Sequence, residues 1–184
     1  RAQPAHLVRR RVRANAATAN AARQAIAVAA RDADGLISLL THDYEAVHHP
    51  TGVTYDRAAA LARLHAVFKG KDVTFAQEPL ATLGDALALS RTLVTASGAS
   101  GGTFDVGPYA HEQIALIEAD SHGQRRRAEF FADDRLGDAV ARLYERYAEL
   151  LADGPERDRA AATARSVAAM LGPPEVDRGA ALAP

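Results

Sequence analysis

Apolar residues recur every three to four positions in several stretches of the chain, which predicts helices there. Helix-favouring residues fill 14–33, and an Asp-Gly stop separates them from a short second helix over 36–40. Leucines and a phenylalanine spaced by three and four give one apolar face to 55–68. The strongest stripe lies in 136–151, where arginines and glutamates occupy the opposite face. A short alanine-rich helix is expected after it, up to about Leu171.

Elsewhere the pattern changes to short segments bounded by turn residues, as is typical of β-strands. The first, 43–49, ends at a Pro-Thr-Gly turn. Four more follow the third helix in succession: 72–82, 85–97, 109–119 and 124–132. The expected order is therefore helix, helix, strand, helix, four consecutive strands and further helix. Antiparallel strands with helices gathered on one face predict an α+β fold.

Composition and charge exclude several classes of function. The 184 residues fit one domain, and 22 Lys and Arg against 23 Asp and Glu leave a net charge of -1. That balance gives no field for attracting nucleic acid or an anionic membrane surface, so neither is expected as a partner. The chain has no cysteine, which excludes disulfides and thiolate chemistry. No cofactor is expected because no phosphate-binding or dinucleotide motif occurs, and the cytoplasm is the default location.

The two ends of the sequence suggest a piece of a longer polypeptide. The chain starts at Arg1 without a methionine, and Gly172-Pro173-Pro174 has the composition of a linker. We divide it into an N-terminal extension (1–13), a folded domain (14–151) and a C-terminal helix with linker (152–184). A second interpretation is that Val167, Met170 and Leu171 dock as a lid over a binding site.

Two motifs resemble the SnoaL-like, or nuclear transport factor 2-like, family. They are the strand end His48-His49-Pro50-Thr51-Gly52 and the last strand, which ends in Glu129-Phe130-Phe131. The family is similar to ketosteroid isomerases and polyketide cyclases, and similar stretches occur as C-terminal modules of larger actinobacterial proteins. The resemblance implies a cone, in which a curved antiparallel sheet and the helices on its concave side enclose an apolar pocket.

The resemblance places His49 where ketosteroid isomerases carry a catalytic carboxylate, immediately before a Pro-x-Gly turn. Imidazole is a capable base near neutral pH. The isomerases also need a tyrosine on the first helix and an aspartic acid on a late strand. Here the first helix offers Gln24-Ala25-Ile26-Ala27, and the strand position falls near Ala115, so the isomerase oxyanion hole is absent.

Strand alternation limits how the histidines can act. His48 and His49 point to opposite faces, so they cannot share one metal ion, and no metal site is expected. The resemblance favours His49 as the inward residue. His111 and Gln113 share a face with Ala115 by period two and would line the same pocket. The other residues expected to line it are Val47, Tyr55 and Phe130.

Two hypotheses of function remain open. The first is a non-catalytic module that binds an apolar small molecule or another protein. The alternative is a small isomerase, cyclase or dehydratase acting on an apolar carbonyl or polyketide-like substrate, with His49 as general base and His111 or Gln113 polarising the oxygen. The histidines could equally be structural, or exposed at a pocket rim.

Two surfaces complete the sequence-based expectations. A homodimer is expected through the open face of the sheet, where Leu87, Leu89 and Leu93 alternate. Arg125-Arg126-Arg127 reads as a solvated edge of the sheet, although the three could bind an anion.

Overall fold

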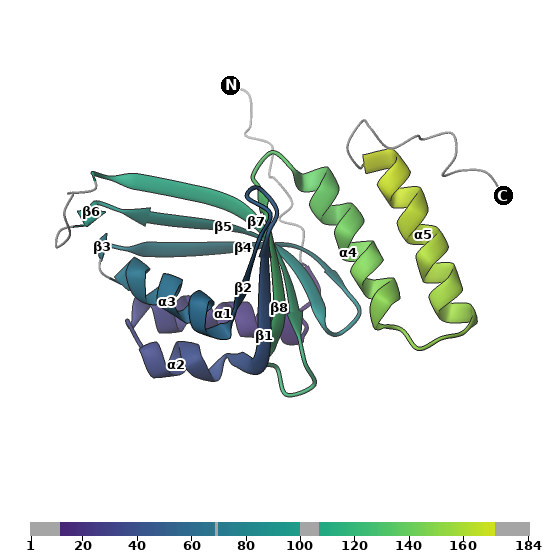
Figure 1. Ribbon diagram of the computed structural model, residues 1–184, viewed down its shortest axis with the longest axis horizontal. Coiled ribbons are helices and arrows are strands. Elements are labelled where there is room, and N and C mark those ends of the chain that lie inside the picture. The colour runs from purple at the N-terminus through teal and green to yellow at the C-terminus, as the bar shows by residue number, and fades with distance from the viewer. Residues whose placement is uncertain (1–11, 69, 100–106, 172–184) are drawn as a thin grey trace, which may run out of the picture.

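A computed structural model describes residues 12–68, 70–99 and 107–171 (Figure 1). Helices α1 (Ala16–Ala29) and α2 (Ala33–Ser38) come first, followed by the strands β1 (Leu40–His48) and β2 (Val53–Asp56) and by α3 (Arg57–Phe68). The later elements are β3 (Gly70–Lys71), β4 (Thr74–Leu83), β5 (Leu87–Ala96), β6 (Gly98–Ala99), β7 (Tyr109–Ala119), β8 (Arg125–Ala132), α4 (Leu136–Leu150) and α5 (Pro155–Leu171).

Six strands form one sheet in the order β2-β1-β8-β7-β5-β4. Every neighbouring pair is antiparallel except β1 and β8, which run parallel. β3 and β6 form a separate two-stranded ribbon. The predicted α+β fold is confirmed, and the strand predicted over 109–119 coincides with β7. The pattern missed β2, because its four residues run directly into the helical stretch of α3.

The two faces of the sheet are covered by different helices (Figure 1). α1, α2 and α3 lie on one face, where Ala17 and Ala21 pack on Ala88, Ala115 and Ile117. α4 lies on the other face, where its apolar stripe meets alternate residues of β5, β7 and β8. That second core contains Leu87, Leu89, Ile114, Leu116, Phe131, Ala139 and Leu143.

The position of α4 corrects the expected homodimer surface. Leu87 and Leu89 are both 0 % exposed, because α4 of the same chain packs over them. Leu87 and Leu89 are therefore not available to a second copy, and this part of the expected surface was wrong, because a strand pattern does not show which helix covers it. Leu93 is half-buried, and the homodimer itself stays a prediction. α5 packs in turn on α4, with Ala164 and Ala169 buried.

The same packing answers the lid interpretation for the described part of the tail. Val167, Met170 and Leu171 do not reach the cavity on the opposite face of the sheet. The contact with α4 is close: a Cβ on Gly137 would lie 2.1 Å from the carbonyl oxygen of Leu171. The division of the chain at residue 151 stays a prediction.

A β-bulge in β8 decides where its arginines lie. Arg127 pairs with Glu118 of β7, whereas Arg125 pairs with the next residue, Ala119, so β8 carries one extra residue, Arg126. The bulge turns Arg125 toward α1 and leaves Arg127 on the face under α4. The prediction of a solvated edge was wrong for Arg125, which is 5 % exposed.

Candidate functional site

A cavity of about 470 Å³ lies between the sheet and helices α1, α2 and α3. Its volume is within the roughly 300–1,000 Å³ typical of small-molecule sites. Most of its wall is aliphatic or aromatic, contributed by Val28, Leu36, Leu39, Leu40, Tyr44, Ala46, Tyr55, Ala60, Leu64, Phe68, Phe75, Val94, Tyr109, Ala115, Ile117 and Phe130. No Asp or Glu occurs among the described residues that line it.

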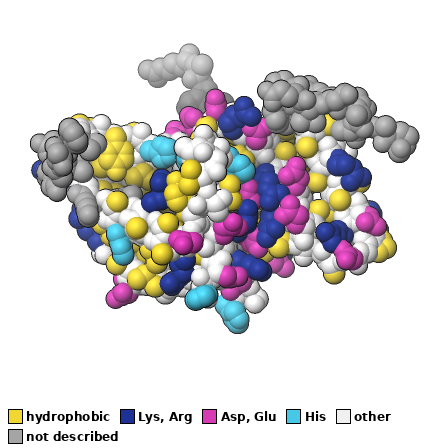
Figure 2. All heavy atoms as spheres, in the orientation of Figure 1, with side chains coloured by type: hydrophobic (Ala, Val, Ile, Leu, Met, Phe, Trp, Pro, Cys, Tyr) yellow, Lys and Arg dark blue, Asp and Glu magenta, His cyan; other side chains and the backbone are white. Residues whose placement is uncertain are grey.

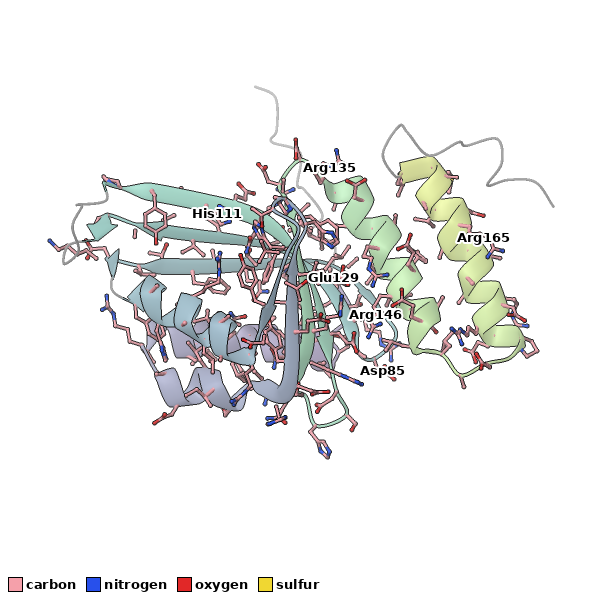
Figure 3. All side chains as sticks on the ribbon, in the orientation of Figure 1. Asp85, His111, Glu129, Arg135, Arg146 and Arg165 are labelled. Carbon is pink, nitrogen blue, oxygen red and sulfur yellow. The ribbon has the colours of Figure 1, made fainter. Side chains whose placement is uncertain are left out.

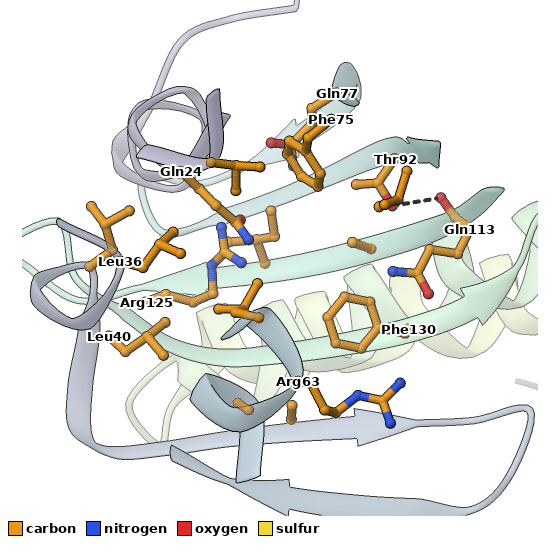
Figure 4. Close-up of a pocket in the computed structure, with 18 of the residues that line it drawn as sticks. Gln24, Leu36, Leu40, Arg63, Phe75, Gln77, Thr92, Gln113, Arg125 and Phe130 are labelled. Carbon is orange, nitrogen blue, oxygen red and sulfur yellow. Dashed lines mark hydrogen bonds between the residues drawn. The ribbon is translucent and has the colours of Figure 1, made fainter. Parts of the chain in front are cut away.

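The two arginines of the cavity lie at opposite ends (Figure 4). One end is closed: Arg125 sits there among Leu36, Leu40 and the end of Gln24. The other end holds exposed Arg63 and His111 and forms the mouth. A ligand that enters at the mouth therefore passes an apolar middle section before it meets a charged group again.

The two adjacent histidines lie as strand alternation requires, but the inward residue is His48. Tyr44, Ala46 and His48 of β1 line the cavity. Burial, followed by the charges of Arg63, His111 and His49, lowers the pKa of His48. Its Nδ1 lies 2.8 Å from the hydroxyl of Thr51, which fixes the ring at the end of the strand.

His49 lies on the opposite face, so the expectation that it points inward was wrong. Its ring stacks on Phe131 at 4.2 Å between centroids, and its Nε2 lies 2.8 Å from Oε2 of Glu129. Because an ionised carboxylate can only accept, Nε2 carries the proton in this bond. The expectation failed because Tyr44, two alternation steps before His48, already sets the inward face of β1. The catalytic roles assigned to His49 and His111 stay predictions, but His49 has no contact with the cavity.

Glu129 is the centre of an ion-pair network between the sheet and α4. Its side chain is 2 % exposed and accepts hydrogen bonds from Arg127, Arg142 and His49 at 2.8–3.1 Å. Burial alone would raise the pKa of Glu129, but the hydrogen bonds from Arg142, Arg127 and His49 lower it to about 2. Figure 3 places Glu129 and Arg146 in this layer.

The network continues toward solvent through paired charges. Arg127 also bonds to Glu45, Arg142 to Glu149, and Arg146 to buried Glu118 at 2.7 Å. Figure 2 shows these alternating basic and acidic side chains between the sheet and α4. Each buried carboxylate of this network thus has an arginine partner. The network therefore has a structural role: it connects the sheet to α4.

The remaining predicted site residues divide between the two faces. Tyr55, His111, Gln113, Ala115 and Phe130 line the cavity as expected. Val47 does not, because it alternates with Ala46 and His48 and lies on the face of His49. His111 Nε2 lies 3.1 Å from Oε1 of Gln113, so these two side chains meet at the mouth.

Sequence analysis missed Arg125 as a cavity residue. Its Nε donates to Oδ1 of Asn20 at 3.0 Å, and its Nη2 is buried without a hydrogen-bond partner among the described residues. Burial lowers the pKa of Arg125, and the nearby hydroxyl of Tyr44 opposes this shift. Burial also raises the pKa of Tyr44, so its hydroxyl is neutral and supplies no counter-charge. No local pattern could have found it, because the bulge in β8 places Arg125 opposite Ala119 on the inward face.

Within the described ranges, no group of three or more His, Asp or Glu side chains is arranged to hold a metal ion. None of the described helices combines the length and the apolar character needed to span a membrane. Besides its apolar surface, the described lining of the cavity contains two arginines and two histidines.

Comparison with known proteins identifies the fold. No protein-family model matches the chain, and no curated protein matches it. A "putative polyketide cyclase" from Xanthomonas campestris matches in structure with a TM-score of 0.51 and 17 % identity, over 70 % of this chain and 96 % of that one. AusH from Aspergillus nidulans matches with a TM-score of 0.53 and 12 % identity, over 67 % and 87 %.

The Mycobacterium tuberculosis protein RV0760c, in complex with estradiol-17β-hemisuccinate, matches with a TM-score of 0.53 and 12 % identity. The match covers 65 % of this chain and 95 % of that one. These similarities confirm the predicted ketosteroid isomerase-like, or nuclear transport factor 2-like, fold. At such identities they concern the fold alone, because one fold hosts many functions.

Proposed function

We propose that this protein is a non-catalytic member of the SnoaL-like family that binds an apolar small molecule in its cavity. The observation that carries the proposal is the lining: a largely aliphatic and aromatic wall with no carboxylate among the described residues. Transfer of an apolar ligand from water to such a wall is favourable at roughly 25 cal/mol per Å² of buried apolar surface. A few polar groups at the two ends would fix its orientation.

The absence of a carboxylate from the described lining supports binding without the family's usual proton transfer. The residue in the family's base position, His49, is held by Glu129 outside the cavity. The family's oxyanion donors are replaced by Gln24 and Ala115 or residues near them. RV0760c holds a steroid derivative in the same fold, which gives a reasonable size class for the first ligands to be tried.

Filling the cavity should remove binding. Val94 lines the cavity and is half-buried, so Val94→Phe adds a ring to the space that a ligand would occupy. We expect the variant to bind the neutral dye N-phenyl-1-naphthylamine at least about tenfold more weakly, a loss of about 1.4 kcal/mol. Dye fluorescence measures this without tryptophan emission, since the chain has no tryptophan.

Ala110→Phe is the matched control, because Ala110 lies exposed on the neighbouring strand β7 and outside the cavity. It should leave dye binding unchanged. Equal dye affinity in the wild type and both variants would mean that the dye, and by extension an apolar ligand, does not use this cavity.

Proton transfer is the second candidate function, favoured by one observation. His48 and His111 both line the cavity near Arg63, and the pKa of His48 is lowered by burial and by these neighbours, so its ring is neutral and can accept a proton. Estrone incubated in D₂O with the protein tests it. Under the first proposal, α-deuterium incorporation measured by mass spectrometry stays at the buffer rate. Faster incorporation that His48→Gln abolishes would establish the second.

A further inference from the structure

The closed end of the cavity contains a charged group without a counter-charge. Arg125 is 5 % exposed, lines the cavity and forms no salt bridge with any described carboxylate. Arg146 and Arg142, whose side chains are 21 % exposed, each pair with a buried acid, Arg146 with Glu118 and Arg142 with Glu129. Since burying a charge is costly unless it is paired, this exception calls for an explanation.

The protein satisfies only part of the guanidinium. Asn20, itself 0 % exposed, accepts from Nε at 3.0 Å. Nη2 is buried and has no acceptor among the described residues. Figure 4 shows the guanidinium beneath the end of Gln24, inside the cavity rather than in the protein wall. This Nη2 group can donate a hydrogen bond to an acceptor atom of a bound ligand.

A second group in the same cavity is also unsatisfied. Both amide atoms of Gln77, on β4, are buried without a hydrogen-bond partner in the described structure. Gln77 lines the cavity, so a polar ligand atom can reach it. Two buried polar side chains with unsatisfied atoms in one mostly apolar cavity indicate a ligand that is apolar along most of its length and polar at defined points.

We infer that the cavity takes an apolar ligand that ends in a carboxylate, with the carboxylate on Arg125 at the closed end. This inference rests on the proposed function. One guanidinium with an open donor matches a single negative charge, and Arg–carboxylate hydrogen bonds are among the strongest in proteins. The apolar residues between Arg125 and the mouth hold the rest of the molecule.

Binding of decanoate and of its neutral isostere decanamide, measured by calorimetry below micellar concentrations, tests the inference. The wild type should bind decanoate at least about tenfold more tightly. Arg125→Gln keeps a donor for Asn20 but removes the charge, and should abolish the preference. Arg126→Gln is the matched control, since Arg126 follows Arg125 on β8 but is 57 % exposed and lies outside the cavity, and it should keep the preference.

The outcomes separate the two proposals. Binding of neither compound overturns the proposed function together with the subsite. Equal binding of both by the wild type overturns the subsite alone, as does a preference that survives Arg125→Gln or disappears in Arg126→Gln.

A measurement on the wild type keeps the inference testable even if Arg125→Gln does not fold. The ¹³C shift of carboxyl-labelled decanoate, followed against pH, reports the ionisation of the bound acid. We expect its pKa in the complex to lie below that of the free acid, because the guanidinium favours the charged form. A pKa equal to or above the free value would show that the carboxylate does not contact Arg125.

Discussion

Replacing Glu129 by glutamine should lower the free energy of unfolding by about 3 kcal/mol, because two arginines then lose their buried carboxylate. Glu129 is 2 % exposed and binds Arg127, Arg142 and His49 at once. Urea unfolding at neutral pH measures the loss. Glu145→Gln is the matched control: Glu145 is 46 % exposed and 3.4 Å from Arg142, so its removal should cost less than about 1 kcal/mol.

The same residue predicts how stability depends on pH. The pKa of Glu129 is about 2 in the folded protein against an ordinary 4.5, so the folded state favours the ionised form. That contribution is fully present above the ordinary value and is lost as the pH falls toward about 2. A difference of this size corresponds to about 3 kcal/mol. The wild type should therefore lose its advantage over Glu129→Gln across this window, and a constant difference between the two would contradict the assignment.

The strands show where sequence patterns suffice. β7 pairs with β5 without interruption from Tyr109 to Glu118, so period-two alternation placed His111, Gln113 and Ala115 correctly. In β1 the same rule separated His48 from His49, but the choice of face came from the family resemblance and was wrong. The apolar side chain of Tyr44, on the face of His48, was the better guide.

The remaining features depend on tertiary structure that no local pattern contains. The bulge in β8 reverses the faces on which regular alternation would place Arg125 and Arg126. It is visible only in the pairing of β8 with β7. The apolar stripe of α4 predicted a buried helix face, yet nothing in it indicated that the helix would cover Leu87 and Leu89. Arg125 lacks a counter-charge among the described residues because of both features. The bulge turns Arg125 into the cavity, and α4, which carries glutamates, packs on the opposite face of the sheet.

Removing the side chain of Asn20 should damage both the fold and the acid preference. Asn20 is 0 % exposed, and its Nδ2 donates at 3.0 Å to the carbonyl oxygens of Leu39 and Gly123. Its Oδ1 accepts from Arg125, so one side chain connects α1 to the C-terminal end of α2, to the β7–β8 turn and to the cavity arginine. Asn20→Ala removes these three hydrogen bonds and leaves Nε of Arg125 without its acceptor, and at about 1 kcal/mol for each lost bond a net loss of about 3 kcal/mol is expected.

Arg23→Ala is the control, because exposed Arg23 donates to the same carbonyl of Gly123 and should cost less than about 1 kcal/mol. Thermal melts give the stability of both variants, and calorimetry with decanoate and decanamide gives their ligand preference. In Asn20→Ala the freed guanidinium is no longer held toward the ligand, so the preference for the acid should fall toward that of Arg125→Gln, whereas Arg23→Ala keeps it. If Asn20→Ala melted like the wild type and still selected the acid, Asn20 would neither join these elements nor position Arg125.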